Sequence, residues 1–104
     1  RKIGMDGQVV ASAPITGGYN PWEVTMFEAG GLFYTLVNDM SENAIVTVFD
    51  ENAVLVPGKS GPIGDGPMPY PWPAYDAATG EVAIAYVSPG WDGDVRVRRF
   101  TLTP

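Results

Sequence analysis

The segment EVAIAYVSPGWDGDVRVRRF, residues 81–100, has the pattern of two β-strands joined by a turn. Its two ends are rich in β-branched and aromatic residues, which favour strands. The Pro-Gly and Asp-Gly pairs between them are typical of turns. In the second strand, Val95 and Val97 share one face and Arg96 and Arg98 share the other, because side chains alternate along a strand.

A similar pattern occurs about 50 residues earlier, so the chain contains an internal repeat. Trp22 falls on Trp72 at a shift of 50 residues, and Val46 falls on Val97 at a shift of 51. Further matches are 14–18 with 62–66, 32–36 with 82–86, and 6–11 with 51–56. The order is kept along the whole chain, and the small changes in shift are those expected of loops between repeated elements.

Each repeat reads as a series of short strands, and no segment shows a sustained helical period. The expected strands are 22–28, 32–38, 44–50 and 53–56 in the first repeat, 72–78, 81–88 and 95–102 in the second, and 8–12 near the start. The Pro-rich segment 61–73 cannot form a central strand, because proline lacks the N–H of the ladder. We expect a stiff, polyproline-like connection there. The sequence therefore predicts an all-β protein.

Four-stranded repeats of about 50 residues have the size of β-propeller blades. The second repeat, with Pro73, Tyr75, Gly80 and its closing Arg99-Phe100, resembles the degenerate propeller repeats of large bacterial extracellular proteins. The resemblance implies two β-propeller blades and an extracellular or cell-surface location, and it says little about function. A β-sandwich built from the same strands is the alternative.

This reading predicts a single β domain over residues 1–104. Residues 1–18 would supply trailing strands of a neighbouring blade, 19–66 the first blade, and 67–104 three strands of the second. Two blades cannot close a ring, since propellers have about four to eight. The ring would be completed by further copies of the chain in a homo-oligomer, or by neighbouring blades of a longer protein.

Composition excludes several classes of function. The chain has no His and no Cys, which excludes thiol catalysis, Cys–His zinc sites and His acid–base chemistry. Its net charge of −6 argues against nucleic acid and anionic membranes as partners, because both require cations. No apolar run is long enough for membrane insertion, which needs about 18 residues or more.

The acidic residues do not form a recognisable catalytic or metal motif. Asp92 and Asp94 have the spacing of calcium loops, but calcium takes about six to eight oxygen ligands. A glycosidase needs two facing carboxylates, and the repeat predicts no such pair. The carboxylates considered are Glu23, Glu28, Asp39, Glu42, Asp76 and Glu81. We therefore expect no enzyme activity, no cofactor and no metal.

Aromatic residues at the blade junctions are the candidate ligand-binding residues. They are Tyr19, Trp22, Tyr70, Trp72 and Trp91. Tyr and Trp rings stack on sugar rings and donate hydrogen bonds from their polar ends, although such residues also fill the space between blades. The expected function is a non-catalytic binding or recognition module, lectin-like in binding carbohydrate. The alternative is a structural or adhesion component of a larger extracellular assembly.

Overall fold

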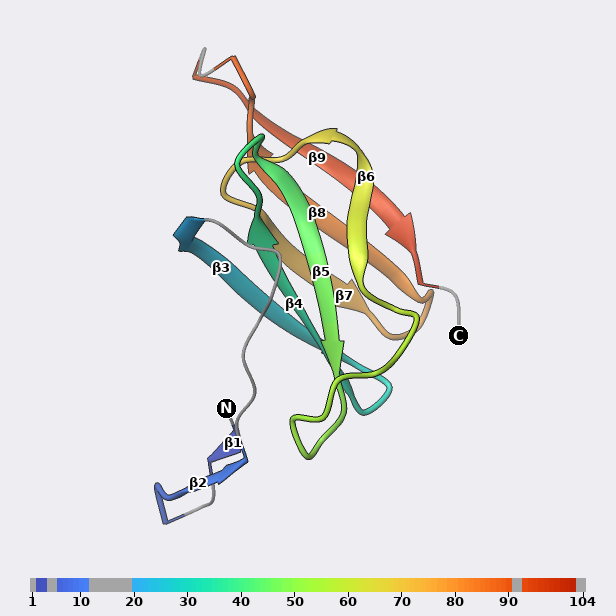
Figure 1. Ribbon diagram of the computed structural model, residues 1–104. Coiled ribbons are helices and arrows are strands. Elements are labelled where there is room, and N and C mark those ends of the chain that lie inside the picture. Colours follow the sequence, from blue (N-terminus) through green and yellow to red (C-terminus); the bar gives the residue numbers. More distant parts are fainter. Residues whose placement is uncertain (1, 4–5, 12–19, 91–92, 103–104) are drawn as a thin grey trace.

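The computed structural model describes the chain except residues 1, 4–5, 12–19, 91–92 and 103–104. Every regular element in the described part is a β-strand, as the sequence predicts (Figure 1). The strands are β1 (Lys2–Ile3), β2 (Val9–Ala11), β3 (Asn20–Ala29), β4 (Leu32–Asn38), β5 (Asn43–Phe49), β6 (Gly61–Pro67), β7 (Trp72–Asp76), β8 (Glu81–Val87) and β9 (Val95–Thr101).

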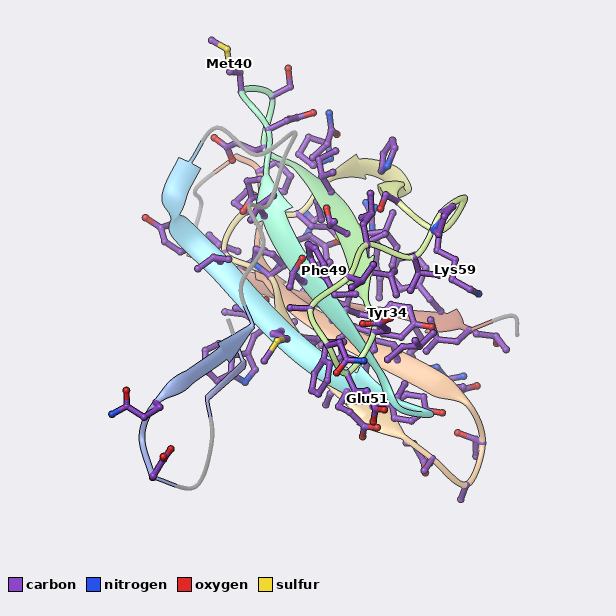
Figure 2. The ribbon with its side chains drawn as sticks, turned by 60° about the horizontal axis from the view of Figure 1, so that its bottom comes forward. Tyr34, Met40, Phe49, Glu51 and Lys59 are labelled. Atoms are coloured by element: carbon purple, nitrogen blue, oxygen red, sulfur yellow. The ribbon has the colours of Figure 1, made fainter. Side chains whose placement is uncertain are left out.

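These strands form two antiparallel sheets and one small hairpin. The first sheet has the order β3-β4-β5-β6 and the second has the order β7-β8-β9. In both, neighbours in the sheet are neighbours in the chain, so every connection is a simple meander. The β1–β2 hairpin pairs only within itself in the described part of the chain, and it stands apart from the two sheets in Figures 1 and 2.

The β3–β4 hairpin forms because its turn residues adopt conformations that glycine tolerates. Gly30 and Gly31 have φ of 59° and 82°, and two successive positive φ values are characteristic of the two-residue turn that matches strand twist. The Gly31 N–H also donates a hydrogen bond of 2.8 Å to Glu28 Oε1. The turn therefore fixes the register of the first two strands.

The second and third strands of the two repeats pair in the same register. In the first sheet Phe33 pairs with Phe49, and in the second Val82 pairs with Phe100. Phe49 and Phe100 are 51 residues apart, as the sequence alignment predicts. Phe33 and Val82 are 49 apart, so a shift of 51 for the third strands goes with a shift of 49 for the second strands, whereas a shift of 50 for the second strands goes with 50 for the third. Because side chains alternate, a one-residue change exchanges the two faces.

The first strands correct the sequence alignment in the same way. Thr25 pairs with Leu36, and Trp72 pairs with Ala85. In strand register, Trp72 therefore corresponds to Thr25 if the second strands are shifted by 49 and to Met26 if they are shifted by 50, and in neither case to Trp22. The resemblance between residues 19–22 and 70–73 does not place the two tryptophans at the same point of the ladder.

The fourth strand of the first sheet differs from the prediction. Residues 53–56 contribute a single bridge, between Leu55 and Phe49, whereas β6 is the strand that pairs with β5. The Pro-rich segment is therefore partly strand instead of polyproline-like throughout. Its position agrees with the physics of proline: β6 is an edge strand, where a missing N–H breaks no ladder.

The two sheets pack against each other around one hydrophobic core. Phe27 and Leu36 from the first sheet meet Ile84 and Tyr86 from the second. The rings of Phe27 and Tyr34 stack with centroids 4.9 Å apart. The other buried members of the core are Ala29, Ala44, Met68 and Val82.

The segment between β6 and β7 joins both sheets to this core. Met68 is fully buried, and Pro69 and Pro71 are almost so. The Asn38 amide donates to the Met68 carbonyl (3.1 Å), and the Val87 N–H donates to the Pro69 carbonyl (2.9 Å). The connection therefore has partners in both sheets.

Candidate functional site

The structure describes part of the predicted aromatic set. Tyr19 and Trp91 lie outside the described residues. Trp22 belongs to β3, but its side chain is also outside the described part. Tyr70 and Trp72 are described, and both are exposed, at 49% and 72%. These two residues are therefore the starting point for a site.

Strand β7 turns Trp72 away from the core because side chains alternate along it. The exposure of β7 alternates from Trp72 to Asp76, and Pro73 and Tyr75 are the less exposed positions. Tyr75 packs on the core, with its ring centroid 6.1 Å from that of Phe27. Trp72 thus points to the opposite, outer side of the second sheet.

The outer side of the second sheet is an exposed apolar surface. Val95 is 72% exposed and Val97 is 62% exposed. Ala83 and Ala85 from β8 lie between β7 and β9. We call this surface the Trp72 face, and it consists of Trp72, Ala74, Ala83, Ala85, Val95 and Val97.

The centre of the Trp72 face is a row of three paired residues across the sheet. Trp72 pairs with Ala85, and Ala85 pairs with Val97. Because neighbouring strands lie about 4.8 Å apart, the row is about 10 Å long. The middle residue, Ala85, carries only a methyl group, so the larger side chains of Trp72 and Val97 project further from the sheet on either side of it.

Charged side chains border this surface at the end near the β7–β8 turn. Arg99 and Glu81 form an ion pair of 3.7 Å between adjacent strands. Arg98 lies on the inner side, where its guanidinium carbon is 5.2 Å from the centroid of the Tyr86 ring. Arg99 pairs with Ala83 and so lies on the same side of the sheet, next to the apolar row, whereas Arg98 lies on the other side.

Tyr70 precedes strand β7 and has a strained backbone conformation. Its φ is 50°, which is unfavourable for a bulky residue. The buried prolines on both sides hold it there. Strain of this kind is often found at functional sites, and the exposed ring is two residues from Trp72.

The described residues contain no cluster that could hold a metal ion. No three His, Cys, Asp or Glu side chains gather closely enough in this part of the chain to hold a metal ion. Asp92 lies outside the described residues, and Asp94 is exposed. Among the described residues, no helix is long and apolar enough to cross a membrane.

Comparisons with known proteins found no relative of this chain. No protein-family model, no curated protein and no solved structure matches the chain. The function must therefore be argued from the surface itself.

Sequence reasoning identified Trp72 but missed the valines beside it. The alternation of 95–98 separates two faces without showing which one meets the core. Val97 was aligned with Val46, a residue that packs on the core. The information that the sequence lacks is the pairing of β8 with β9, in which Val97 lies opposite Ala85 and not opposite a buried β8 residue.

Proposed function

We propose that this protein is a non-catalytic binding module of a larger β-sheet assembly, and that the Trp72 face is its binding surface. The observation that carries the proposal is the exposed row of Trp72, Ala85 and Val97. Large contiguous apolar patches on a soluble protein commonly mark interaction sites. Burying one Val-sized side chain contributes about 1.5–3 kcal/mol.

The first sheet supports the choice of another β-sheet as partner. When Val46 is aligned with Val97, as the sequence repeat suggests, Leu36 and Val46 form the row that corresponds to Ala85 and Val97. In the first sheet this row packs against the second sheet: Leu36 is fully buried, and Val46 lies against the core. The same position in the ladder is thus covered by a sheet in one repeat and exposed in the other.

A propeller of such repeats is consistent with these features and belongs to the proposal. Both sheets are meanders, as propeller blades are. With Val46 aligned with Val97, the first sheet covers the second with the face that corresponds to the Trp72 face, which supports the proposal. Successive blades of a propeller pack with the same polarity, so a further sheet on the Trp72 face would continue the series. The proposed extracellular location rests on the sequence resemblance alone.

The test is the mass of the native assembly and its dependence on this face. We expect wild-type protein at micromolar concentration to sediment as a species larger than the single chain. Replacing Trp72 and Val97 together by Lys should reduce that mass, because two charges would have to be buried without partners. Met40→Lys is the matched control, since Met40 points away from both sheets at the tip of the β4–β5 turn (Figure 2). Equal masses for all three proteins would contradict the proposal.

Carbohydrate binding is the second candidate, and the exposed pair of Tyr70 and Trp72 favours it. Aromatic rings stack on the apolar faces of sugars, and repeated weak sites gain strength through avidity. On a glycan array, Trp72→Ala should remove the signal and Tyr70→Ala should weaken it. Met40→Ala should leave the signal unchanged. Binding that survives both aromatic substitutions would exclude this site.

A further inference from the structure

We infer that the free edge of β9 binds an acidic, extended segment of a partner protein, which adds a further strand to the second sheet. This inference goes beyond the proposed function, because it concerns the edge of the sheet and not the Trp72 face. A sheet that covers the face and a strand that extends the edge approach from different directions, so each is tested separately.

The edge of β9 is regular and uncovered. β9 is the last strand in the order β7-β8-β9, and among the described residues no strand other than β8 lies close enough to pair with it (Figure 1). It pairs with β8 in an unbroken register from Val95 to Thr101 and contains no proline. Val95 and the Arg99 side chain are each 72% exposed. Edges of this kind are templates for pairing with another chain.

Two hydrogen bonds show which backbone groups of β9 face outward. The Ser88 N–H donates to the Asp94 carbonyl (3.0 Å), and the Leu102 N–H donates to the Gly80 carbonyl (3.0 Å). Even-numbered residues on this side of the ladder therefore bond to β8, and the direction alternates along the strand. The odd-numbered residues direct their N–H and C=O groups away from β8, and they are Val95, Val97, Arg99 and Thr101.

The first sheet shows how the corresponding edge is filled. There β5 is the third strand, and β6 pairs with it antiparallel on the side away from β4. β9 is the third strand of the second sheet and has no such neighbour in the described chain. A strand added to β9 would give the second sheet the same four-stranded order, through the main-chain hydrogen bonds that extended peptides use.

The charges of β9 favour an acidic partner strand. Half of the six Lys and Arg residues lie in this strand, although the net charge of the chain is −6. β9 contains no acidic residue, and Asp94 precedes it. Arg98 is directed inward, whereas Arg96 and Arg99 are exposed. Glu81 contacts Arg99 from the β8 side at 3.7 Å, and a guanidinium has further N–H donors for a second carboxylate from the open side.

The same arginines disfavour a second copy of this chain at the edge. Two β9 strands could pair antiparallel about a centre at any residue from 96 to 99. In each of these registers at least one arginine lies directly opposite an arginine of the other copy, because arginines occupy positions 96, 98 and 99. Like charges directly opposite destabilise a strand pair, whereas opposite charges stabilise it. The edge thus discriminates between an acidic strand and its own copy.

The spacing of Arg96 and Arg99 specifies the pattern of the partner strand. In an antiparallel pair, the residues opposite these two arginines are three positions apart and lie on opposite faces of the sheet. The residue opposite Val97 lies between them and extends the Trp72 face, so an apolar residue suits that position. The expected ligand is an extended segment with two Asp or Glu three positions apart among β-branched residues.

The first experiment uses a synthetic peptide as long as β9, which consists of Thr and Val with two Glu three positions apart. Isothermal titration calorimetry measures its binding to the full chain. We expect it to bind about 10-fold more tightly than the same peptide with two Gln, and this difference should shrink in about 1 M salt. A Glu peptide that does not bind, or that binds no better than the Gln peptide, overturns the acidic partner.

Charge reversal on the protein locates the site. Arg96→Glu and Arg99→Glu together should weaken binding of the Glu peptide by about 10-fold or more, and should create binding of a peptide with Lys at the same two positions. Lys59→Glu reverses a charge in the loop before β6 and is the control, which should leave binding unchanged. Circular dichroism confirms folding of each variant. A double variant that still prefers the Glu peptide overturns the site on β9.

N-methylation of the peptide tests strand pairing itself. Along an added strand, only alternate N–H groups face β9. Of two Glu peptides methylated at alternate residues, one should lose binding and the other should keep it, and loss in both or in neither overturns strand addition. Sedimentation of the protein alone tests the other occupant. A change in mass caused by Arg96→Glu and Arg99→Glu would show that a second copy occupies the edge, and would also overturn the inference.

Discussion

The two sheets of this protein have the same ladder and different surroundings. Their second and third strands pair in the same register, yet β4 ends in four consecutive buried residues while β8 alternates between buried and half-buried. The first sheet thus has neighbours on both sides, and the second has one. Strand pairing is set locally by turns and alternation, whereas the burial of a face depends on what the rest of the chain places against it.

The largest effect expected from this difference is at Leu36. It is fully buried, and it corresponds in register to Ala85. Leu36→Ala should lower the free energy of unfolding by about 2–5 kcal/mol, the usual cost of a cavity in a packed core. Urea denaturation measures the change, with Val97→Ala as the exposed control, for which we expect about 0.5 kcal/mol or less. A cost below about 1 kcal/mol for Leu36→Ala would mean that the first sheet is not the better packed of the two.

A smaller effect is expected at Asn38, which corresponds to Val87 in the second sheet. Asn38 is fully buried, and its amide donates to the carbonyls of Glu42 (3.0 Å) and Met68 (3.1 Å). Asn38→Val keeps the size of the side chain and leaves those carbonyls without this donor, at a cost of about 1–3 kcal/mol. Thermal or urea unfolding gives the value. The reverse change, Val87→Asn, should lower the free energy of unfolding clearly less. Equal losses for the two variants would contradict the expected difference between the two sheets.

The smallest effect is expected at the ion pair between Arg99 and Glu81. The two side chains are 72% and 39% exposed, and exposed pairs contribute about 0–1 kcal/mol. Arg99→Ala should therefore change the unfolding free energy by less than about 1 kcal/mol, and the change should shrink further in 1 M salt. Arg96→Ala is the control on the same strand. A salt-independent loss of several kcal/mol would show that this corner of the second sheet is buried in solution.

The strands themselves could largely be predicted from the sequence. The expected strand 32–38 agrees with β4 at both ends. The expected strand 95–102 begins with β9 and extends one residue beyond its end. These segments are rich in β-branched and aromatic residues, and each follows a turn that contains glycine. The fourth strand was misplaced because 53–56 has the stronger β-forming residues. The chain instead pairs β6, whose prolines are harmless at an edge.

The candidate site was predictable only in part. Trp72 was identified as an aromatic beside a strand start, and its side chain is exposed. Val95 and Val97 were not, because alternation separates two faces without indicating which is inside. The decision depends on a single residue of register between β8 and β9, and register is a property of the paired strands rather than of either sequence. The sequence repeat also aligns Trp22 with Trp72, because an alignment of the sequence does not contain the pairing between strands.

The hydrogen bonds around the β6–β7 connection have a consequence for how the protein unfolds. Met68 donates to the Glu42 carbonyl (3.0 Å), and the Thr25 hydroxyl donates to the Pro71 carbonyl (3.0 Å). Releasing this connection would break contacts in both sheets at once and expose the fully buried Met68. The two repeats should therefore melt in one cooperative transition, and neither half should persist as a folded fragment after a cut between them.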